Sequence, residues 1–460
     1  MKTSYDISET LKPVENRYII LLIVLTGVLM SEIDGTIVTV ALPTMTHYFN
    51  VGLQLSEWVI TGYLLTKTSM LLIFGKTSEY FGKTKLFILG FLIFTVSSFA
   101  CGISTNMGQL IFFRIIQALG ASMAFSIAAA IIVDVFPKEE IGRALGYQIV
   151  ATGIGIISGP SLGGFIVDWL GWNYIFFINV PIGIILLAAS SKYLRFEEKT
   201  SKTLQMDWIG AMLFIMFTTS FILAFDEISN GLGSNLSMIY IAIFALSLTA
   251  FMLRELKCQN PLFDLSMFKV RNFSRSITAS LLFLVSVGMF TIIIPFYFQD
   301  LLKWTATKVG LVMMIIPLML MVLSPVVGYA YDKYKLQNLP TLGLVIMGVS
   351  AILFGYMLAE KEVLIAIAST ILLGAGAAVF MGPNNTDVMN SIPNKSNVLS
   401  SIASTFRNMG TVLGVSLASL LISQLNSNLN ESMIKAIYIV GLICIISSII
   451  ASNTRNNSLN

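Results

Sequence analysis

Residues 17–46 read RYIILLIVLTGVLMSEIDGTIVTVALPTMT, an apolar run interrupted by two carboxylates, Glu32 and Asp34. About 20 mostly apolar residues are enough for a helix to cross a bilayer, so this run predicts a membrane span. Asp34 lies roughly 25 Å along a helix that begins near Arg17, in the far half of the span. A carboxylate at that depth is costly and usually faces protein or a water-filled cavity. We therefore expect a functional group inside the first span.

The whole chain has a similar composition. Of its 460 residues, 56% are hydrophobic and only 11% are charged, against about 25% charged residues in a typical soluble domain. So few charges cannot cover a water-exposed surface, which excludes an ordinary soluble enzyme, a disordered chain and a nucleic-acid binder. Three scattered cysteines and a single histidine, His47, argue against a disulfide framework, a metal cluster and Ser-His-Asp catalysis. We expect an integral membrane protein without a cofactor.

Fourteen such apolar runs follow one another along the chain. The predicted spans are residues 17–46, 55–75, 85–104, 108–136, 141–168, 172–194, 207–226, 236–254, 274–301, 306–331, 338–359, 362–389, 396–425 and 433–453. Strands of a membrane barrel would be about ten residues long and would alternate in polarity, whereas these runs are apolar throughout. The fold class is therefore an all-α integral membrane protein, and the polar first 16 residues do not resemble a signal peptide.

Basic residues predict the orientation of the spans, because cytoplasmic loops carry an excess of Lys and Arg. The two tails and alternate connections hold 21 of the 28 basic residues, the intervening connections hold four, and Lys67, Arg114 and Arg407 fall inside spans. This alternation supports an even number of spans, with both termini on the cytoplasmic side of a prokaryotic cell membrane.

The spans divide as 6+2+6. We expect a cytoplasmic tail (1–16), a six-helix bundle (17–195), a basic linker with two inserted helices (196–256), a cytoplasmic loop (257–273), a second six-helix bundle (274–453) and a cytoplasmic tail (454–460). Residues 75–85, GKTSEYFGKTK, have a weaker echo in 328–335, GYAYDKYK, at the matching place in the second half. Such an echo indicates two related halves, the plan of many secondary transporters.

Four stretches resemble motifs of the major facilitator superfamily. Residues 75–85 resemble its loop signature between spans 2 and 3, although that family usually has Asp where this chain has Glu79. Residues 114–121, RIIQALGA, are similar to its span-4 motif, and residues 155–164, GIISGPSLGG, to its span-5 antiporter motif. Residues 32–43, EIDGTIVTVALP, resemble the span-1 motif of the fourteen-span drug:proton antiporter branch. Smaller matches lie at 172–183, 207–210, 260–264 and 407–410.

This resemblance implies a major facilitator fold and a proton-coupled exporter of amphipathic, including cationic, compounds. Two six-helix bundles would alternate in access around a central cavity, with the proton gradient as the energy source. The implied partners are the lipid bilayer, a small-molecule substrate and the proton, and the chain would act as a monomer. No Gly-x-x-x-x-Gly-Lys-Ser/Thr loop is present for an ATP-driven pump, and neither an enzyme nor a channel explains the repeated halves.

Four charged residues are candidates for proton coupling. The resemblance makes Asp34 the proton carrier, and a structural ion pair with Arg114, at a similar depth in span 4, is the alternative. Glu32 lies about 200° round the helix from Asp34 and would face a neighbouring helix, in a structural or a functional role. Lys67 lies midway along span 2, where a buried lysine needs an acid, Asp34 or Glu32. It could instead anchor the substrate of a different exporter, one for an anionic or zwitterionic metabolite, lipid or peptide.

The remaining candidates concern the cavity and its gates. Gly155, Gly159 and Gly163 recur every four residues, which lets helices touch closely, and Pro160 favours a kink. Such a contact suits a gate, or ordinary packing. The resemblance implies a conformational latch, which could equally be a solvated charge run, formed by Gly75, Glu79, Gly82 and Lys83. Polar residues inside a bundle often line a substrate path, which here suggests Tyr63, Gln117, Arg407, Asn408 and Asn384.

Overall fold

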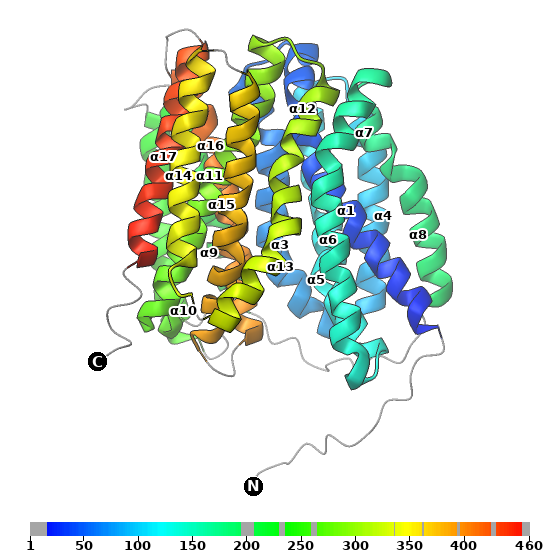
Figure 1. The fold of residues 1–460 in the computed structure, drawn as a ribbon. Coiled ribbons are helices and arrows are strands. Elements are labelled where there is room, and N and C mark those ends of the chain that lie inside the picture. The colour runs from blue at the N-terminus through cyan, green and yellow to red at the C-terminus, as the bar shows by residue number, and fades with distance from the viewer. Residues whose placement is uncertain are drawn as a thin grey trace, which may run out of the picture.

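The structure is a computed structural model that describes residues 16–194, 207–229, 235–258, 265–334, 336–360, 363–392, 396–424 and 429–452 (Figure 1). The described part of the chain is all-helical, as expected. The side chains of a few residues within these ranges, Glu79 among them, lie outside the described set.

The first half of the chain forms one set of helices. They are α1 (Arg17–Phe49), α2 (Leu53–Ser56), α3 (Trp58–Phe81), α4 (Lys83–Gly102), α5 (Met107–Val135), α6 (Lys138–Trp169), α7 (Tyr174–Phe177) and α8 (Asn179–Tyr193). Two helices follow, α9 (Trp208–Ser229) and α10 (Asn235–Lys257).

The second half repeats the pattern. Its elements are η1 (Leu265–Lys269), α11 (Arg271–Phe296), η2 (Tyr297–Leu301), α12 (Ala306–Met313), α13 (Ile315–Tyr334), α14 (Leu339–Glu360), α15 (Val363–Asn390), α16 (Ser396–Gln424) and α17 (Leu429–Ser452). Here η1 is a 3₁₀ helix and η2 is a π-helical turn.

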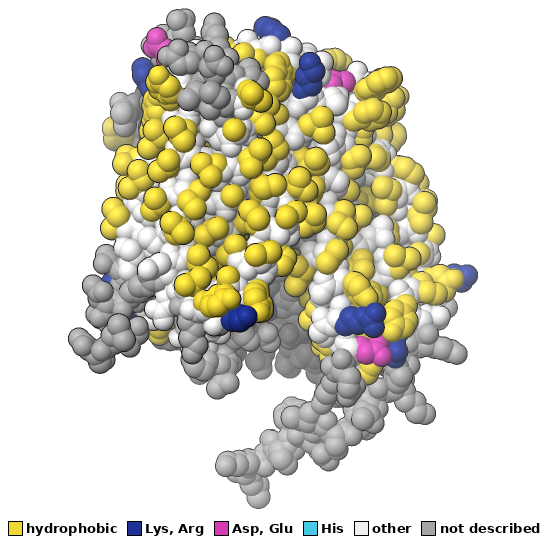
Figure 2. All heavy atoms as spheres, viewed as in Figure 1, with side chains coloured by type: hydrophobic (Ala, Val, Ile, Leu, Met, Phe, Trp, Pro, Cys, Tyr) yellow, Lys and Arg dark blue, Asp and Glu magenta, His cyan; other side chains and the backbone are white. Residues whose placement is uncertain are grey.

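Twelve helical segments of the described chain are long and apolar enough to cross a membrane. The expected number of fourteen is therefore not confirmed. The described apolar part of α9 is shorter, Trp208–Ala224, and α3, which carries Lys67 at its middle, is not among the twelve. Hydrophobic side chains cover the broad middle of the face in Figure 2, and Lys and Arg gather toward its two ends, which suits a protein surrounded by lipid.

The two halves use the same helix contacts. In the first bundle α1 packs on α6, α4 on α5 and α8, and α3 on α5; in the second, α11 packs on α16, α14 on α15 and α17, and α13 on α15. Glycines permit equivalent close approaches. A Cβ on Gly120 would lie 2.5 Å from the Gly90 carbonyl oxygen, and one on Gly343 would lie 2.7 Å from that of Gly376. Backbone contact of this kind is common where membrane helices associate.

Residues 75–85 are not a loop in this structure. Helix α3 continues to Phe81 and α4 begins at Lys83, so that Gly82 alone joins them. Its φ of +92° is a backbone conformation that a side chain would strain. A loop was expected here because residues 75–85 include many polar residues. In the structure these residues form the last turns of α3 and the first turn of α4, because both helices extend beyond the apolar runs.

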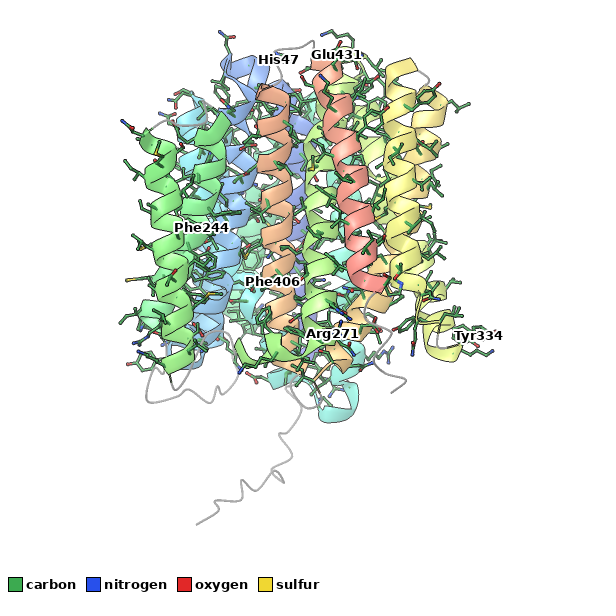
Figure 3. All side chains as sticks on the ribbon, turned by 90° about the vertical axis from the view of Figure 1, so that its left-hand side faces the viewer. His47, Phe244, Arg271, Tyr334, Phe406 and Glu431 are labelled. Atoms are coloured by element: carbon green, nitrogen blue, oxygen red, sulfur yellow. The ribbon has the colours of Figure 1, made fainter. Side chains whose placement is uncertain are left out.

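Hydrogen bonds join the two bundles at the end of the molecule where α1 finishes, called here the His47 end (top of Figure 3). The π-helical turn η2 carries two of the groups. Gln299 Nε2 donates to the Val40 carbonyl oxygen at 2.8 Å, and Asp300 Oδ1 lies 2.7 Å from His47 Nε2. From α6, the Asp168 carboxylate accepts the backbone N–H groups that begin α12, at 3.0 and 2.7 Å.

The same end is closed by direct backbone contact between α6 and α12. A Cβ on Gly310 would lie 2.3 Å from the Pro160 carbonyl oxygen, and one on Gly164 would lie 2.3 Å from that of Ala306. The two bundles therefore touch here without intervening side chains, and any added atom must push the helices apart.

The inserted helices α9 and α10 pack on each other, and α9 contacts both α3 and α16. The pair therefore lies over the line where α3 of the first bundle meets α16 of the second. We call this line the α3–α16 seam.

We expect Gly310→Ala to open the His47 end, because its Cβ meets backbone that cannot rotate away. Overpacking costs about 1–3 kcal/mol, so the open state should gain roughly 5- to 150-fold in population. The measurement is the rate at which a polar maleimide labels Thr44→Cys, whose native side chain faces Gln299, in nanodiscs and in a Cys258→Ser background.

Gly52→Ala is the matched control, because nothing lies within 4 Å of its added Cβ. Equal labelling of Thr44→Cys in the Gly310→Ala and Gly52→Ala proteins would contradict the proposed contact.

Candidate functional site

Asp34, on α1, lies at the centre of a closed polar network. Its side chain is fully buried, and three side chains donate to its carboxylate. Arg114 Nη1 lies 2.7 Å from Oδ2, while Gln117 Nε2 and Asn179 Nδ2 lie 2.9 and 2.8 Å from Oδ1. The donors come from α5 and α8, so the carboxylate ties three helices of the first bundle together.

Arg114, like Asp34, is buried and makes several hydrogen bonds. Its guanidinium is fully buried and also donates from Nε to the Val59 carbonyl oxygen at 3.2 Å and from Nη1 to Gln117 Oε1 at 2.6 Å. The Arg114 Cζ lies 4.0 Å from the centre of the Tyr63 ring, a distance typical of a cation–π contact. The site therefore includes residues of α3 as well.

Gln117 extends the network to α4, because its Nε2 also lies 2.7 Å from Ser98 Oγ. We call Asp34, Arg114, Gln117, Asn179 and Ser98 the Asp34 cluster. Five helices meet in it: α1, α4, α5 and α8 through side chains, and α3 through the Val59 carbonyl. A buried ion pair is tolerated when additional hydrogen bonds satisfy both partners, and this cluster supplies them.

A second ion pair lies beside the first. Lys67 Nζ, on α3, is 3.3 Å from Glu32 Oε1 and 3.2 Å from Ser31 Oγ. The sequence left Asp34 and Glu32 open as partners of Lys67, and the structure places it with Glu32. The Lys67 ammonium also lies 4.7 Å from the centre of the Phe125 ring. We call Glu32, Lys67, Ser31 and Phe125 the Lys67 cluster.

The Lys67 cluster borders the other bundle. Arg407, half-buried on α16, interacts electrostatically with Glu32. Asn408, next to it, is also half-buried. Glu32 therefore interacts with a charge from each bundle, Lys67 and Arg407.

Tyr63 lies between the two clusters. Its ring centre is 4.0 Å from Arg114 Cζ and 5.9 Å from Lys67 Nζ. The side chain is buried, and its hydroxyl oxygen has no hydrogen-bond partner within the described part of the chain. A single aromatic ring therefore separates the two cations and contacts both.

The Asp34 charge balances the Arg114 charge inside this enclosed site. If the carboxylate took up a proton in place, Arg114 would keep its charge in a buried site without a counter-ion, and removing one partner of a buried pair costs about 3–5 kcal/mol. The Asp34 cluster is also closed on every side by protein. All five members of the cluster are at most 2% exposed.

The glycines of α6 pack it against α1 within the same bundle. Cβ atoms on Gly155, Gly159 and Gly163 would lie 2.8 Å from Glu32 Cβ, 1.9 Å from Thr36 Oγ1 and 2.7 Å from the Ile37 carbonyl oxygen. Contact with the opposite bundle is made instead by Gly164 and the Pro160 carbonyl. The glycine motif therefore positions Glu32 on one side and closes the His47 end on the other.

Three residues expected to line a substrate cavity are enclosed by protein here. Tyr63 and Gln117 are fully buried among the groups above. Asn384 is buried too, and its Nδ2 donates to the Ser276 carbonyl oxygen at 3.2 Å, which joins α15 to α11. A polar residue in an apolar span indicates that its side chain is buried inside the bundle. Its position in the sequence does not show whether it lines a cavity or forms a hydrogen bond to a neighbouring helix.

The expected latch is described only in part. Lys83 forms an ion pair with Asp134 of α5, a partner that the sequence did not suggest. The side chain of Glu79 lies outside the described residues. Gly75 lies within α3 with open space around it, and Gly82 forms the sharp turn between α3 and α4.

Two members of the Asp34 cluster were missed as site residues. Asn179 and Ser98 are small polar residues inside apolar spans, which is the signal that could have singled them out. Serines of that kind are frequent in this chain, so only the meeting of α4, α5 and α8 distinguishes Ser98 from the rest.

The model of the Major Facilitator Superfamily matches residues 24–415. The riboflavin transporter RibZ of Clostridioides difficile is 33% identical over 412 residues, 89% of each chain. The multidrug export protein EmrB of Haemophilus influenzae is 29% identical over 389 residues, 84% of this chain and 76% of that protein.

Solved structures agree in fold. A peptide transporter POT in complex with sulfate has a TM-score of 0.72 and 13% identity, with 94% of each chain covered. A D-xylose–proton symporter has a TM-score of 0.66 and 14% identity, with 94% of this chain and 97% of that chain covered. The protein is a membrane transporter rather than an enzyme, and the chain belongs to the Major Facilitator Superfamily.

Proposed function

We propose that the protein is a proton-coupled exporter of amphipathic, including cationic, compounds, with Asp34 as the proton carrier. The observation that carries the proposal is the enclosure of the Asp34–Arg114 ion pair, with its three donor side chains, inside a bundle of a transporter fold. The similarity to multidrug export proteins supports export of such compounds.

The cycle follows from the two clusters. With the His47 end closed, Asp34 is sealed and paired with Arg114. Opening of that end, together with separation of α1 from α5 or α8, admits a proton, which neutralises Asp34 and releases Arg114 from its ion pair. Return of the carrier releases the proton on the opposite side. At about 2.3 kcal/mol per charge per 100 mV, the membrane potential assists the inward movement of the proton.

In this proposal the chain crosses the cytoplasmic membrane fourteen times, as 6+2+6, with both termini in the cytoplasm. Helix α3 takes part in the first bundle through its contact with α5, and α9 pairs with α10. Both therefore occupy the positions of spanning helices. Lys67 lowers the hydropathy of α3, but its charge is neutralised by Glu32.

A second candidate is transport of riboflavin or a similar polar ring metabolite. The observation that favours it is the 33% identity to the riboflavin transporter over most of both chains. The Lys67 cluster is chemically suited to bind such a ring compound. The cluster combines an ammonium group, a carboxylate and the Phe125 ring, and Arg407 of the other bundle lies beside it. It keeps Lys67 as the anchor, as in the alternative from the sequence, but with an uncharged ring compound in place of the anionic or zwitterionic substrate expected there.

We expect Asp34→Asn to abolish substrate-triggered proton movement. The amide keeps the size of the carboxylate but cannot take up the proton. The measurement is lumenal pH in proteoliposomes with an imposed proton gradient, after addition of tetraphenylphosphonium or ethidium.

Asp207→Asn is the matched control, because Asp207 is also a buried, ion-paired carboxylate, bound to Arg254 away from the cluster. Proton movement that persists in Asp34→Asn at the wild-type rate would show that Asp34 is not the carrier.

We expect Lys67→Ala to separate the two candidates. Hydrogen bonds to charged groups contribute about 1.5–3 kcal/mol, so a substrate anchored by Lys67 should exchange roughly 10- to 150-fold more slowly. The measurement is counterflow of labelled riboflavin into proteoliposomes, with Lys67→Arg as the variant that retains the charge. Riboflavin counterflow lost in Lys67→Ala and kept in Lys67→Arg favours the second candidate. No riboflavin counterflow in the wild type excludes riboflavin as the substrate.

A further inference from the structure

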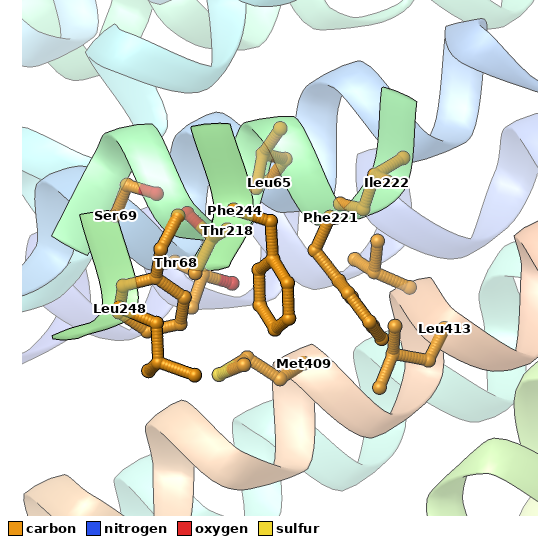
Figure 4. A pocket seen from close by; sticks show the side chains of 12 residues that line it. Leu65, Thr68, Ser69, Thr218, Phe221, Ile222, Phe244, Leu248, Met409 and Leu413 are labelled. Carbon is orange, nitrogen blue, oxygen red and sulfur yellow. The ribbon is translucent and has the colours of Figure 1, made fainter. Parts of the chain in front are cut away.

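A cavity of about 220 Å³ lies where the inserted helices cover the α3–α16 seam. Figure 4 shows the side chains that line it, which come from α3, α9, α10 and α16. Among them are Leu65, Ser69, Phe217, Phe244, Leu248 and Met409. The cavity is separate from the Asp34 and Lys67 clusters, none of whose residues contributes to its wall.

The wall is apolar except for three hydroxyl groups, and two of these are satisfied by their own helices. Thr68 Oγ1 donates to the Leu64 carbonyl oxygen at 2.7 Å, and Thr218 Oγ1 donates to that of Phe214 at 2.8 Å. Ser69 differs. Its side chain is 3% exposed, and its Oγ has no hydrogen-bond partner within the described part of the chain. A buried hydroxyl without a partner is rare in proteins and calls for an explanation.

The position of Ser69 limits what could satisfy it. Ser69 lies about 9 Å inside the end of the apolar run at residue 75, and therefore within the hydrocarbon part of the bilayer. The wall offers a bound molecule one free O–H donor, that of Ser69, because the Thr68 and Thr218 protons are already donated and only their oxygen lone pairs remain. The hydrocarbon chain of a lipid has no hydrogen-bond acceptor at that depth.

We propose that this cavity binds a lipophilic small molecule with one hydrogen-bond acceptor, which enters from the bilayer and accepts the Ser69 hydroxyl proton. The aromatic and aliphatic wall takes the apolar body of the molecule, as in most small-molecule sites. The ligand touches α3 and α16, which belong to different bundles, together with both inserted helices. The site goes beyond the proposed function, since binding there needs neither a proton gradient nor the Asp34 cluster.

Benzophenone is a suitable probe, because it is lipophilic, carries one carbonyl acceptor and forms covalent adducts with nearby C–H groups on illumination. Purified wild-type protein in nanodiscs is illuminated with benzophenone, and the adducts are mapped by peptide mass spectrometry. We expect adducts at Met409 and at the α9 segment 217–222. Adducts confined to lipid-exposed residues such as Leu246 would overturn the proposal.

Two variants test the contacts. Ser69→Ala should lower labelling at Met409 about fivefold, the effect of one hydrogen bond of ~1 kcal/mol. Leu248→Trp fills the cavity and should abolish that labelling. Ser220→Ala is the control, because Ser220 lies on α9 outside the wall and bonds the Met216 carbonyl oxygen; its labelling should equal that of the wild type. Labelling unchanged in both Ser69→Ala and Leu248→Trp would overturn the site.

Competition by diphenylmethane, which has the shape of benzophenone without the carbonyl group, tests the class of ligand. With deuterated benzophenone as the probe, we expect diphenylmethane to compete about fivefold less well than ordinary benzophenone in the wild type, and as well as ordinary benzophenone in Ser69→Ala. If diphenylmethane competed as well as benzophenone in both the wild type and Ser69→Ala, the cavity would be a plain apolar site for acyl chains, which would contradict the proposal. The labelling experiments measure binding and involve no transport. A failure of the proposed site can therefore be distinguished from a failure of the proposed proton coupling.

Discussion

The ion pair between Asp34 and Arg114 is the interaction on which the arrangement of the first bundle depends. Two opposite charges within a bilayer are tolerated only when their remaining hydrogen-bonding capacity is satisfied. Gln117, Asn179 and the Val59 carbonyl oxygen satisfy it. Since these partners come from separate helices, the charges dictate how α1, α3, α5 and α8 rotate toward one another.

Close backbone contact is the second constraint, and it acts on both bundles. Without a hydrophobic force between helices in lipid, association relies on packing and hydrogen bonds. Glycines allow α4 to meet α5, and α14 to meet α15, at equivalent places. The contact of α6 with α12 through Gly164 and Gly310 uses the same principle between the bundles. There it closes the His47 end of the transporter.

The charged groups divide into an enclosed cluster and one at the boundary of the bundles. The Asp34 cluster is sealed within the first bundle, whereas Glu32 of the Lys67 cluster also senses Arg407 across the interface. Tyr63 lies between them and contacts both cations. Lys67 and Tyr63 lie between Glu32 and Arg114. The inserted helices lie outside this chain of contacts, over the α3–α16 seam, where their own cavity is found.

Local sequence determined the membrane location and most of the spans, because these depend only on long apolar runs. It also identified Asp34, Arg114 and Lys67 as buried charged residues, because a charge inside an apolar run is not tolerated by lipid alone. It also determined the glycine pattern of α6, since spacing along a helix fixes which face a residue occupies. Only the tertiary structure decided that Lys67 pairs with Glu32, that Gln117 and Tyr63 are enclosed, and that Asn179 binds Asp34 from 145 residues away. The reason is physical: those choices depend on how separate helices are rotated and placed against one another, and the periodicity of a single helix contains no information about its neighbours.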